Sequence, residues 1–261
     1  MIDLWYSLAG ALVGVLVGLT GVGGGSLMAP LLILLFGFSP AVAIGTDLWF
    51  AAITKTVGGV IHRHVGSPDW KVVARLSVGS IPAAILTLFW LGKAHAGRLD
   101  ADLLLGLLGL ALFLTAMLMP LKNRYRATMN RLRHKINPRV RRQQLIATVI
   151  SGAMVGCLVT LTSVGAGALV AAILMILYPL RLSTKSVVST DIVHAVPLAI
   201  VAAIGHSWFG NVDWSLLGLL LAGSIPGIIL GSLLAGKINE VYVRSALAVM
   251  LALTGIKLIV G

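Results

Sequence analysis

The sequence predicts an all-α integral membrane protein built from two related halves. Hydrophobic residues make up 58% of its 261 residues and charged residues only 11%, whereas soluble domains average about 45–50% and about 25%. Apolar stretches recur from residue 5 to residue 260, and about 20 apolar residues suffice to cross a bilayer as a helix. Motifs of the first half also return in the second half at a nearly constant offset.

The internal repeat sets the domain organisation. LTGVGGGSL at 19–27 matches LTSVGAGAL at 161–169, and SPAVAIGTD at 39–47 matches STKSVVSTD at 183–191. The motifs Asp-Trp and Gly-Ser-Ile-Pro follow in the same register in both halves. We therefore expect a first repeat (1–121), a basic cytoplasmic loop (122–143) and a second repeat (144–261).

Each repeat contains four hydrophobic segments, of which the first is too long for one crossing. A continuous helix over residues 5–37 would measure roughly 50 Å, against a hydrocarbon core of ~30 Å. Its middle, Gly21 to Gly25, is a poor helix interior. The segment should break into two half-helices, which either fold back as a hairpin or cross with a kink. The predicted segments are 5–37, 41–61, 72–92, 101–121, 145–179, 185–205, 215–236 and 241–260.

The distribution of positive charge favours the hairpin. Much of the net charge of +12 lies in residues 122–143, which the enrichment of Lys and Arg in cytoplasmic loops explains without a nucleic-acid partner. These residues also suit contacts with anionic lipid headgroups. With hairpins, the loops at 62–71, 180–185 and 237–244 face the cytoplasm as well, and all carry Lys or Arg. Each repeat is then a Gly-broken hairpin plus three transmembrane helices, and the two repeats are inverted, a common plan of secondary transporters.

The two glycine breaks are the first candidate site. Non-helical backbone at membrane depth is tolerated only where protein buries it or where it lines a cavity. A half-helix that begins there directs free N–H groups and its positive dipole end at the cavity, which suits an anion; close helix packing by small residues is the alternative. The predicted anion-binding residues at the breaks are Thr20, Gly21, Gly23, Gly24, Gly25, Ser26, Thr162, Ser163, Gly165 and Gly167.

Charged residues inside the membrane segments are the second candidate. Lys55 offers positive charge to an anion, or forms an ion pair with Asp47 some ~12 Å along the same helix. Asp47 and Asp191 occupy equivalent places in the two repeats, and each follows a threonine. They tune the charge or couple an ion, or else they cap the broken backbone. Thr46 counts among the binding residues.

The histidines form the third group. His194 stands three residues after Asp191, on one helical face, where a proton relay competes with simple packing. His62 and His206 match in the repeat and are expected to pack or to anchor the segment ends. The one cysteine, Cys157, is expected in the core.

Other function classes lack their signatures. No His, Cys and carboxylate cluster has metal-ligand spacing, no P-loop pattern occurs, and no nucleophile has a base at a recognisable spacing. We therefore expect neither a cofactor nor an enzyme.

The glycine break with its following segment, LTGVGGGSLMAPLLILLFGFSPAVAIGTDLWFAAITKTVGG, resembles the sulfite exporter TauE/SafE family of bacterial membrane proteins, as do STDIVHAVPLAIVAAIGH and VDWSLLGLLLAGSIPGIILGSLLAGK. The resemblance covers both repeats. It implies a multi-pass secondary transporter of the bacterial inner membrane that carries sulfite or an organosulfonate by alternating access. Asp47 departs from the family pattern, in which many members carry an uncharged residue after Gly-Thr.

Alternatives to this function remain open. One alternative is an ion-coupled carrier of another small solute or of a cation, which would use Asp47 and Asp191. Another is a membrane enzyme or scaffold that transports nothing. Assembly into a homo-oligomer is left open as well.

Overall fold

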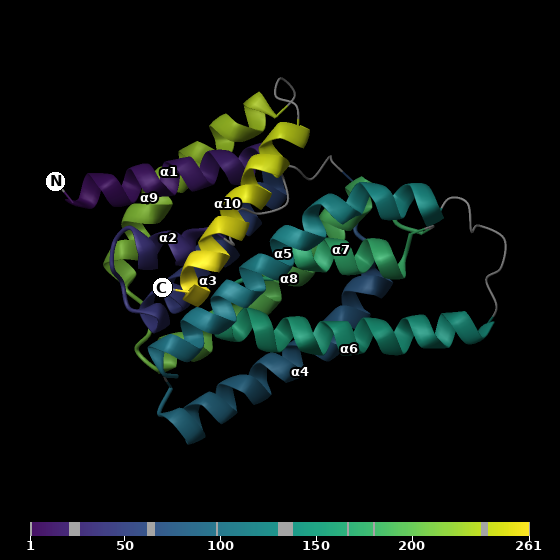
Figure 1. Cartoon of the computed structure of the whole chain (residues 1–261), viewed down its shortest axis with the longest axis horizontal. Coiled ribbons are helices and arrows are strands. Elements are labelled where there is room, and N and C mark those ends of the chain that lie inside the picture. Colours follow the sequence, from purple (N-terminus) through teal and green to yellow (C-terminus); the bar gives the residue numbers. More distant parts are fainter. Residues whose placement is uncertain are drawn as a thin grey trace.

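A computed structural model of the chain describes residues 2–20, 27–61, 66–97, 99–129, 138–165, 167–179, 181–235 and 240–260. All regular elements in these ranges are α-helices, as predicted (Figure 1). They are α1 (Ile2–Thr20), α2 (Met28–Leu34), α3 (Pro40–Ile61), α4 (Trp70–His95), α5 (Ala101–Met129), α6 (Pro138–Thr162), α7 (Ala168–Leu177), α8 (Thr184–Trp208), α9 (Trp214–Leu234) and α10 (Glu240–Val260).

The opening segment of each repeat folds back as a hairpin. The ring of Tyr6, near the start of α1, lies 4.9 Å from the ring of Phe36, just beyond α2. The hydroxyl of Thr148 on α6 lies 2.8 Å from that of Tyr178, just beyond α7. Both pairs occupy equivalent repeat positions, and a continuous helix would place their members roughly 45 Å apart. The kinked crossing is therefore ruled out in favour of the hairpin.

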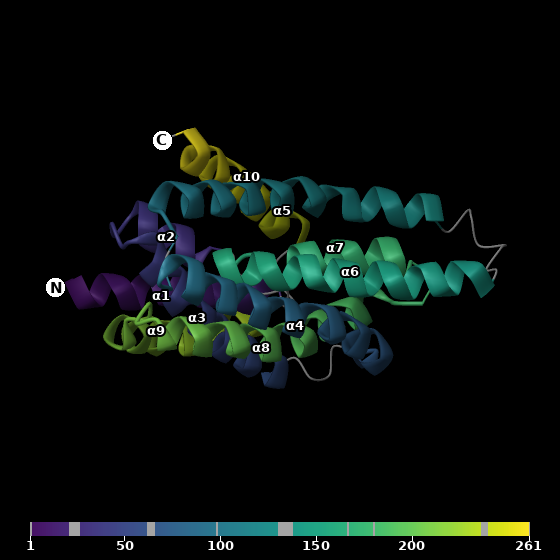
Figure 2. The ribbon, with the colours of Figure 1, turned by 90° about the horizontal axis from the view of Figure 1, so that it is seen from below.

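Each hairpin packs against the other repeat. Helix α1 lies along α9, and its equivalent α6 lies along α4 (Figure 1 and Figure 2). A Cβ added at Gly14 would lie 2.3 Å from the carbonyl oxygen of Ser224, and one added at the equivalent Gly156 would lie 2.2 Å from that of Ser80. Small residues that let backbones touch are a main device for packing helices in membranes. The two repeats are thus interlocked through matching pairs of helices.

Helices α3 and α8 pack together between these pairs and run in opposite directions. The hydroxyl of Ser189, early in α8, donates to the carbonyl oxygen of Gly66, after the end of α3. Trp49 of α3 donates through Nε1 to Ser207, near the end of α8. Equivalent helices that pack antiparallel agree with inverted repeats, whose orientation across the bilayer stays a prediction.

An ion pair places two of the predicted cytoplasmic loops on one face. Arg181 Nη2 lies 2.8 Å from Asp69 Oδ1, and Nε contacts the other carboxylate oxygen at 2.5 Å. These residues belong to the loops at 180–185 and 62–71. A full crossing by each opening segment would have separated these loops, so the ion pair agrees with the placement derived from charge.

The Asp-Trp motifs start helices. The carboxylate of Asp69 accepts from the backbone N–H groups of Lys71 and Val72 at the start of α4. That of Asp213 accepts from Leu216 N–H at the start of α9. An N-cap side chain of this kind satisfies N–H groups that have no partner within the helix.

The basic segment 122–143 is more helical than expected. Helix α5 continues into it as far as Met129, and α6 begins at Pro138. Arg, Lys, Gln and Met are good helix formers, so the helices extend beyond the apolar stretches; the stretch 130–137 lies outside the described residues.

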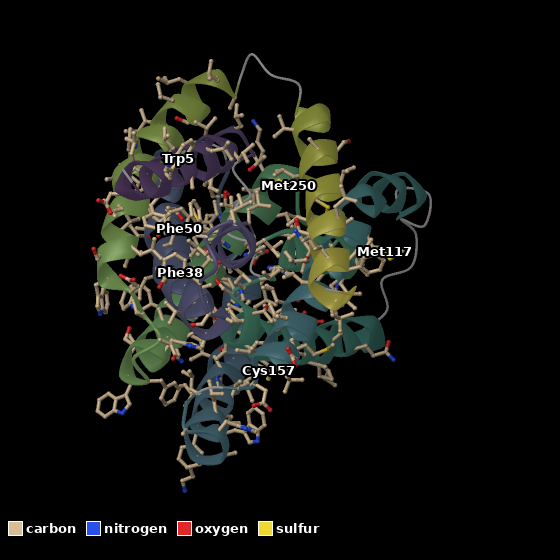
Figure 3. All side chains as sticks on the ribbon, turned by 60° about the vertical axis from the view of Figure 1, so that its left-hand side comes forward. Trp5, Phe38, Phe50, Met117, Cys157 and Met250 are labelled. Atoms are coloured by element: carbon tan, nitrogen blue, oxygen red, sulfur yellow. The ribbon has the colours of Figure 1, made fainter. Side chains whose placement is uncertain are left out.

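Apolar side chains cover both the inside and the outside of the bundle, as expected in lipid. Phe50 is fully buried, whereas Met117 on α5 and Met250 on α10 are exposed (Figure 3). The expectation that Cys157 lies in the core is wrong: it is exposed, and the hydroxyl of Thr87 donates to its sulfur at 3.3 Å. An apolar run in a membrane protein does not distinguish a core residue from one that faces lipid.

Among the described residues, five helices are long and apolar enough to cross a membrane. They lie in α1, α4, α6, α8 and α9. Two further apolar stretches are shorter, 101–117 in α5 and 245–259 in α10. The chain is a multi-pass membrane protein.

Candidate functional site

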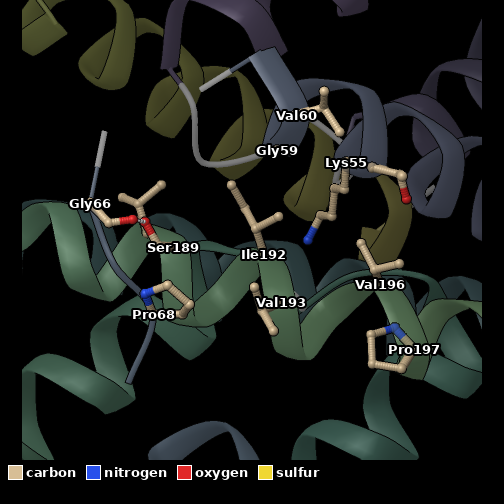
Figure 4. A pocket seen from close by; sticks show the side chains of 12 residues that line it. Lys55, Gly59, Val60, Gly66, Pro68, Ser189, Ile192, Val193, Val196 and Pro197 are labelled. Carbon is tan, nitrogen blue, oxygen red and sulfur yellow. Dashed lines mark hydrogen bonds between the residues drawn. The ribbon is translucent and has the colours of Figure 1, made fainter. Parts of the chain in front are cut away.

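A cavity of about 460 Å³ lies between the second half of α3 and the first half of α8. Most of its wall is apolar. Among the described residues that line it, the charged one is Lys55, whose Nζ points into the cavity between Ile192 and Val196 (Figure 4). At its other end lie Gly66 and Pro68 of the loop after α3, so the cavity reaches the face of the predicted cytoplasmic loops. The lining residues are Lys55, Thr56, Gly59, Val60, Gly66, Pro68, Val188, Ser189, Ile192, Val193, Val196 and Pro197.

Lys55 connects the cavity to the centre of the molecule. Its side chain is only 4% exposed. The ammonium interacts electrostatically with Asp191 and, less strongly, with Asp47. The sequence suggested Asp47 alone as its partner, on the same helix. The packing of α3 against α8 adds Asp191 of the other repeat, whose interaction with Lys55 is the stronger of the two. A buried cation thus lies where the two repeats meet.

Asp47 caps the broken backbone, which was one of the two roles expected for it. Its side chain is fully buried, and Oδ2 accepts from the backbone N–H of Ala29, in the first turn of α2, at 3.3 Å. The carboxylate therefore lies at the start of a half-helix, where the positive dipole end favours negative charge. The hydroxyl of Ser163, from the glycine break of the other repeat, lies beside it.

Thr46 and its repeat equivalent Thr190 hold loops of the opposite repeat. The hydroxyl of Thr46 accepts from the backbone N–H of Asp213, and that of Thr190 accepts from Asp69 N–H, both at 3.0 Å. Both threonines are fully buried. This pairing gives Thr46 a structural role beside the binding role predicted from sequence.

His194 is buried near the same centre. Its Nε2 lies 2.8 Å from the hydroxyl of Ser80 on α4, and its ring interacts electrostatically with Lys55. His206 lies farther along α8 and is also buried, with Nε2 2.9 Å from the carbonyl oxygen of Thr160. Packing thus accounts for His206, whereas His194 belongs to the charged centre; His62 lies outside the described residues.

The second glycine break separates α6 from α7. The hydroxyl of Thr162 bonds to the carbonyl oxygen of Leu158 and accepts from Val164 N–H. Ser163 and Gly165 have φ values of 58° and 117°, which no helix interior allows, and Gly167 precedes the first residue of α7. Within this break, the structure places Ser163 next to Asp47.

The first break is described only at its edge. Thr20, the last residue of α1, is buried and donates to the carbonyl oxygen of Leu16. The remaining predicted residues, Gly21, Gly23, Gly24, Gly25 and Ser26, lie outside the described residues.

The repeat-related side of the α3–α8 contact is filled. The equivalent of Val193 in the cavity wall is Trp49. Its indole donates to Ser207 at 2.8 Å and lies 5.9 Å from the ring of Trp214. Next to it, a Cβ added at Gly45 would lie 2.0 Å from the carbonyl oxygen of Asn211. Access along this contact is therefore asymmetric, with space toward Gly66 and close packing toward Asn211.

Sequence reasoning missed several of these residues. Ser189 and Thr56, which place hydroxyl groups at the cavity, follow no motif that marks them. Trp49 could have been noticed in the sequence, because its equivalent in the second repeat is the much smaller Val193. A difference between equivalent positions indicates where two similar halves differ in shape.

Comparison with known proteins places this chain in a family. The profile of the family described as Sulfite exporter TauE/SafE matches residues 6–258. The chain belongs to this family. The resemblance seen in the glycine break and the segments after it is thereby confirmed.

Two relatives from Bacillus subtilis (strain 168) extend over nearly the whole chain. The probable membrane transporter protein YjnA is 37% identical over 257 residues, covering 97% of this chain and 98% of the relative. The probable membrane transporter protein YdhB is 30% identical over 252 residues, covering 95% and 96%. No solved structure matches the chain. As a TauE/SafE member, the chain is a membrane transporter.

Proposed function

We propose that the chain is a secondary transporter that moves a small sulfur-containing anion, sulfite or an organosulfonate, across the cell membrane by alternating access. The observation that carries the proposal is the buried ammonium of Lys55 at the inner end of a cavity between the two repeats. The description of the family, sulfite exporter, supports the choice of anion.

The chemistry of the cavity suits an oxyanion. An ammonium group can donate several hydrogen bonds to sulfite or sulfonate oxygens, and such charge-assisted bonds are about twice as strong as neutral ones. Thr56 and Ser189 also line the cavity, but their hydroxyls already donate to the carbonyl oxygens of Ala52 and Gly66, so the ammonium of Lys55 is the proposed donor. Apolar walls at Ile192 and Val196 keep the local dielectric low, which strengthens the attraction of the anion to Lys55.

The breaks remain part of the proposed binding site. Ser163 adjoins Asp47, and Asp47 interacts with Lys55, so the second break lies within one interaction network with the cavity. Its glycines, Gly165 and Gly167, allow an anion to approach the backbone closely.

The asymmetry of the α3–α8 contact supports alternating access. The cavity at Val193 and the packed indole of Trp49 occupy equivalent places in the two repeats. If the repeats exchanged conformations, the cavity would close and the Trp49 side would open. Transporters with inverted repeats alternate access by such a movement around a fixed site.

The transport test uses purified protein in liposomes, with uptake of sulfite, sulfoacetate, thiosulfate and sulfate measured separately. Wild type should carry one or more of the first three faster than sulfate. Lys55→Gln removes the charge with little change in volume and should reduce that flux at least tenfold. Lys93→Gln, at an exposed lysine of α4, is the matched control and should retain it. Equal flux in the two variants would remove Lys55 from the site, and no flux of any anion would refute the proposed function.

The alternating-access test exchanges residues between the repeats. In a Cys157→Ser background, Ser189→Cys reports on the cavity and Ser207→Cys on the opposite side, through reaction with a polar thiol reagent. The double exchange Trp49→Val and Val193→Trp should slow labelling at Ser189→Cys and speed it at Ser207→Cys. Unchanged labelling at both positions would contradict the mechanism.

A further inference from the structure

Two buried oxygen atoms at the meeting point of the repeats have no hydrogen-bond partner among the described residues. They are Oδ1 of Asp47, whose side chain is fully buried, and Oγ of Ser163, which is 6% exposed. The two side chains lie close enough to interact, but their distance and angles do not form a hydrogen bond. Buried polar atoms in folded proteins nearly always have partners, so this pair indicates a missing ligand.

The position of Ser163 adds to this indication. It directly follows Thr162, the last residue of α6, so the carbonyl end of a 25-residue helix lies next to the carboxylate. Helix C-termini carry partial negative charge and favour cations. Ser163 also has a φ of 58°, a left-handed backbone conformation that residues other than glycine rarely adopt. Strained backbone of this kind concentrates at ligand sites.

The formal charges around this point balance only when a further positive charge is bound or one carboxyl is protonated. The charged or titratable groups that interact there are the carboxyls of Asp47 and Asp191, the ammonium of Lys55 and the imidazole of His194. Lys55 interacts more strongly with Asp191 than with Asp47. With both carboxyls ionised and His194 neutral, the centre carries one excess negative charge. Unbalanced charge is expensive at membrane depth, and one monovalent cation removes the excess.

We propose that Asp47 and Ser163 form a site for a monovalent cation, sodium or a proton, which is carried together with the substrate anion. This inference rests on the proposed function. An anion that binds Lys55 adds negative charge to a centre that already has an excess, so its binding is favoured when the cation is present. The cation and the anion then stabilise each other across Lys55. Discontinuous helices supply such cation ligands in other inverted-repeat transporters.

The repeat provides a variant suited to the test. The equivalent of Ser163 in the first repeat is Gly21, which has no hydroxyl. Ser163→Gly therefore removes the proposed ligand by copying the other repeat. It also places glycine where φ is 58°, so the fold is retained or gains stability. Ser224→Ala is the matched control, since Ser224 is also buried and its hydroxyl donates within its own helix, to the carbonyl oxygen of Leu221.

The binding experiment needs no substrate. The thermal midpoint of detergent-purified protein is measured against NaCl, with choline chloride holding the ionic strength constant, and proton uptake is followed with a pH indicator in weak buffer. We expect the midpoint to rise with sodium, or the protein to take up a proton with acidification. In Asp47→Asn and Ser163→Gly, the concentration for half the effect should increase about tenfold or more. Ser224→Ala should behave as wild type.

Flux in liposomes then separates the two cations. An inward sodium gradient that accelerates anion uptake identifies sodium; acceleration by an acidic outside alone identifies the proton. Both must disappear in Asp47→Asn. Flux that ignores both gradients, or a gradient effect that survives in Asp47→Asn, overturns the cation site while the proposed function stands. If no anion is carried, the proposed function fails. The binding experiment tests the cation site separately: a wild-type response to sodium and protons in Asp47→Asn and Ser163→Gly overturns the site.

Discussion

An alanine at Gly14 should destabilise the contact between α1 and α9. Its Cβ would lie 2.3 Å from the carbonyl oxygen, 2.7 Å from Cα and 2.9 Å from the carbonyl carbon of Ser224, all backbone atoms of a packed helix. The helices must move apart by several tenths of an ångström, which weakens close contacts along their length. Overpacking of this kind typically costs about 1–3 kcal/mol, or a fall of roughly 2–10 °C in the thermal midpoint.

The matched control lies on the same pair of helices. Gly218 of α9 has no atom within 4 Å of an added Cβ, so Gly218→Ala should leave stability unchanged or raise it by about 0.5–1 kcal/mol through helix propensity. The repeat equivalent Gly156→Ala should lose stability as Gly14→Ala does. Differential scanning fluorimetry in detergent measures all three. Equal midpoints for Gly14→Ala and Gly218→Ala would refute the claim that backbone contact at glycine holds the repeats together.

Three single substitutions should cause smaller losses of stability, each measured as a change in the midpoint of thermal unfolding. Asp213→Ala removes the N-cap of α9 and should cost about 1 kcal/mol, while Asp213→Asn should restore most of it. Tyr178→Phe removes a buried hydroxyl that bonds Thr148 and should cost about 1–2 kcal/mol; no loss would mean that this bond does not fix the second hairpin. Arg181→Gln breaks an ion pair whose arginine side chain is 39% exposed, so the loss should stay below about 1 kcal/mol.

Much of the architecture was predictable because it depends on features local in sequence. The repeat motifs revealed two halves, and the apolar stretches located the helices to within a few residues, except where α5 and α6 extend into the basic segment. The glycines between 21 and 25 predicted a break in the first segment. Charge at 62–71 and 180–185 correctly favoured hairpins, because Lys and Arg are retained on one side of a membrane.

The partners of the charged residues were not predictable in the same way. Lys55 and Asp47 are eight positions apart on one helix, and the sequence offered only that pairing. Asp191 joins them because α3 and α8 pack antiparallel, and no local pattern encodes the register of that contact. Cys157 was misplaced for a related reason: in lipid, apolar residues face both outward and inward, so burial depends on the helix contacts formed.

The position of Asp47 changes how the glycine breaks relate to substrate. The first turn of α2 already donates an N–H to the chain's own carboxylate, so this end of the half-helix has less positive potential to offer a second anion. The positive charge that faces the cavity is instead that of Lys55. The negative end of α6, with Ser163 and the free oxygen of Asp47, is suited to a cation. The two half-helix ends therefore differ in chemistry although they occupy equivalent places in the repeat, and our proposals assign the anion to Lys55 and the cation to Asp47 and Ser163.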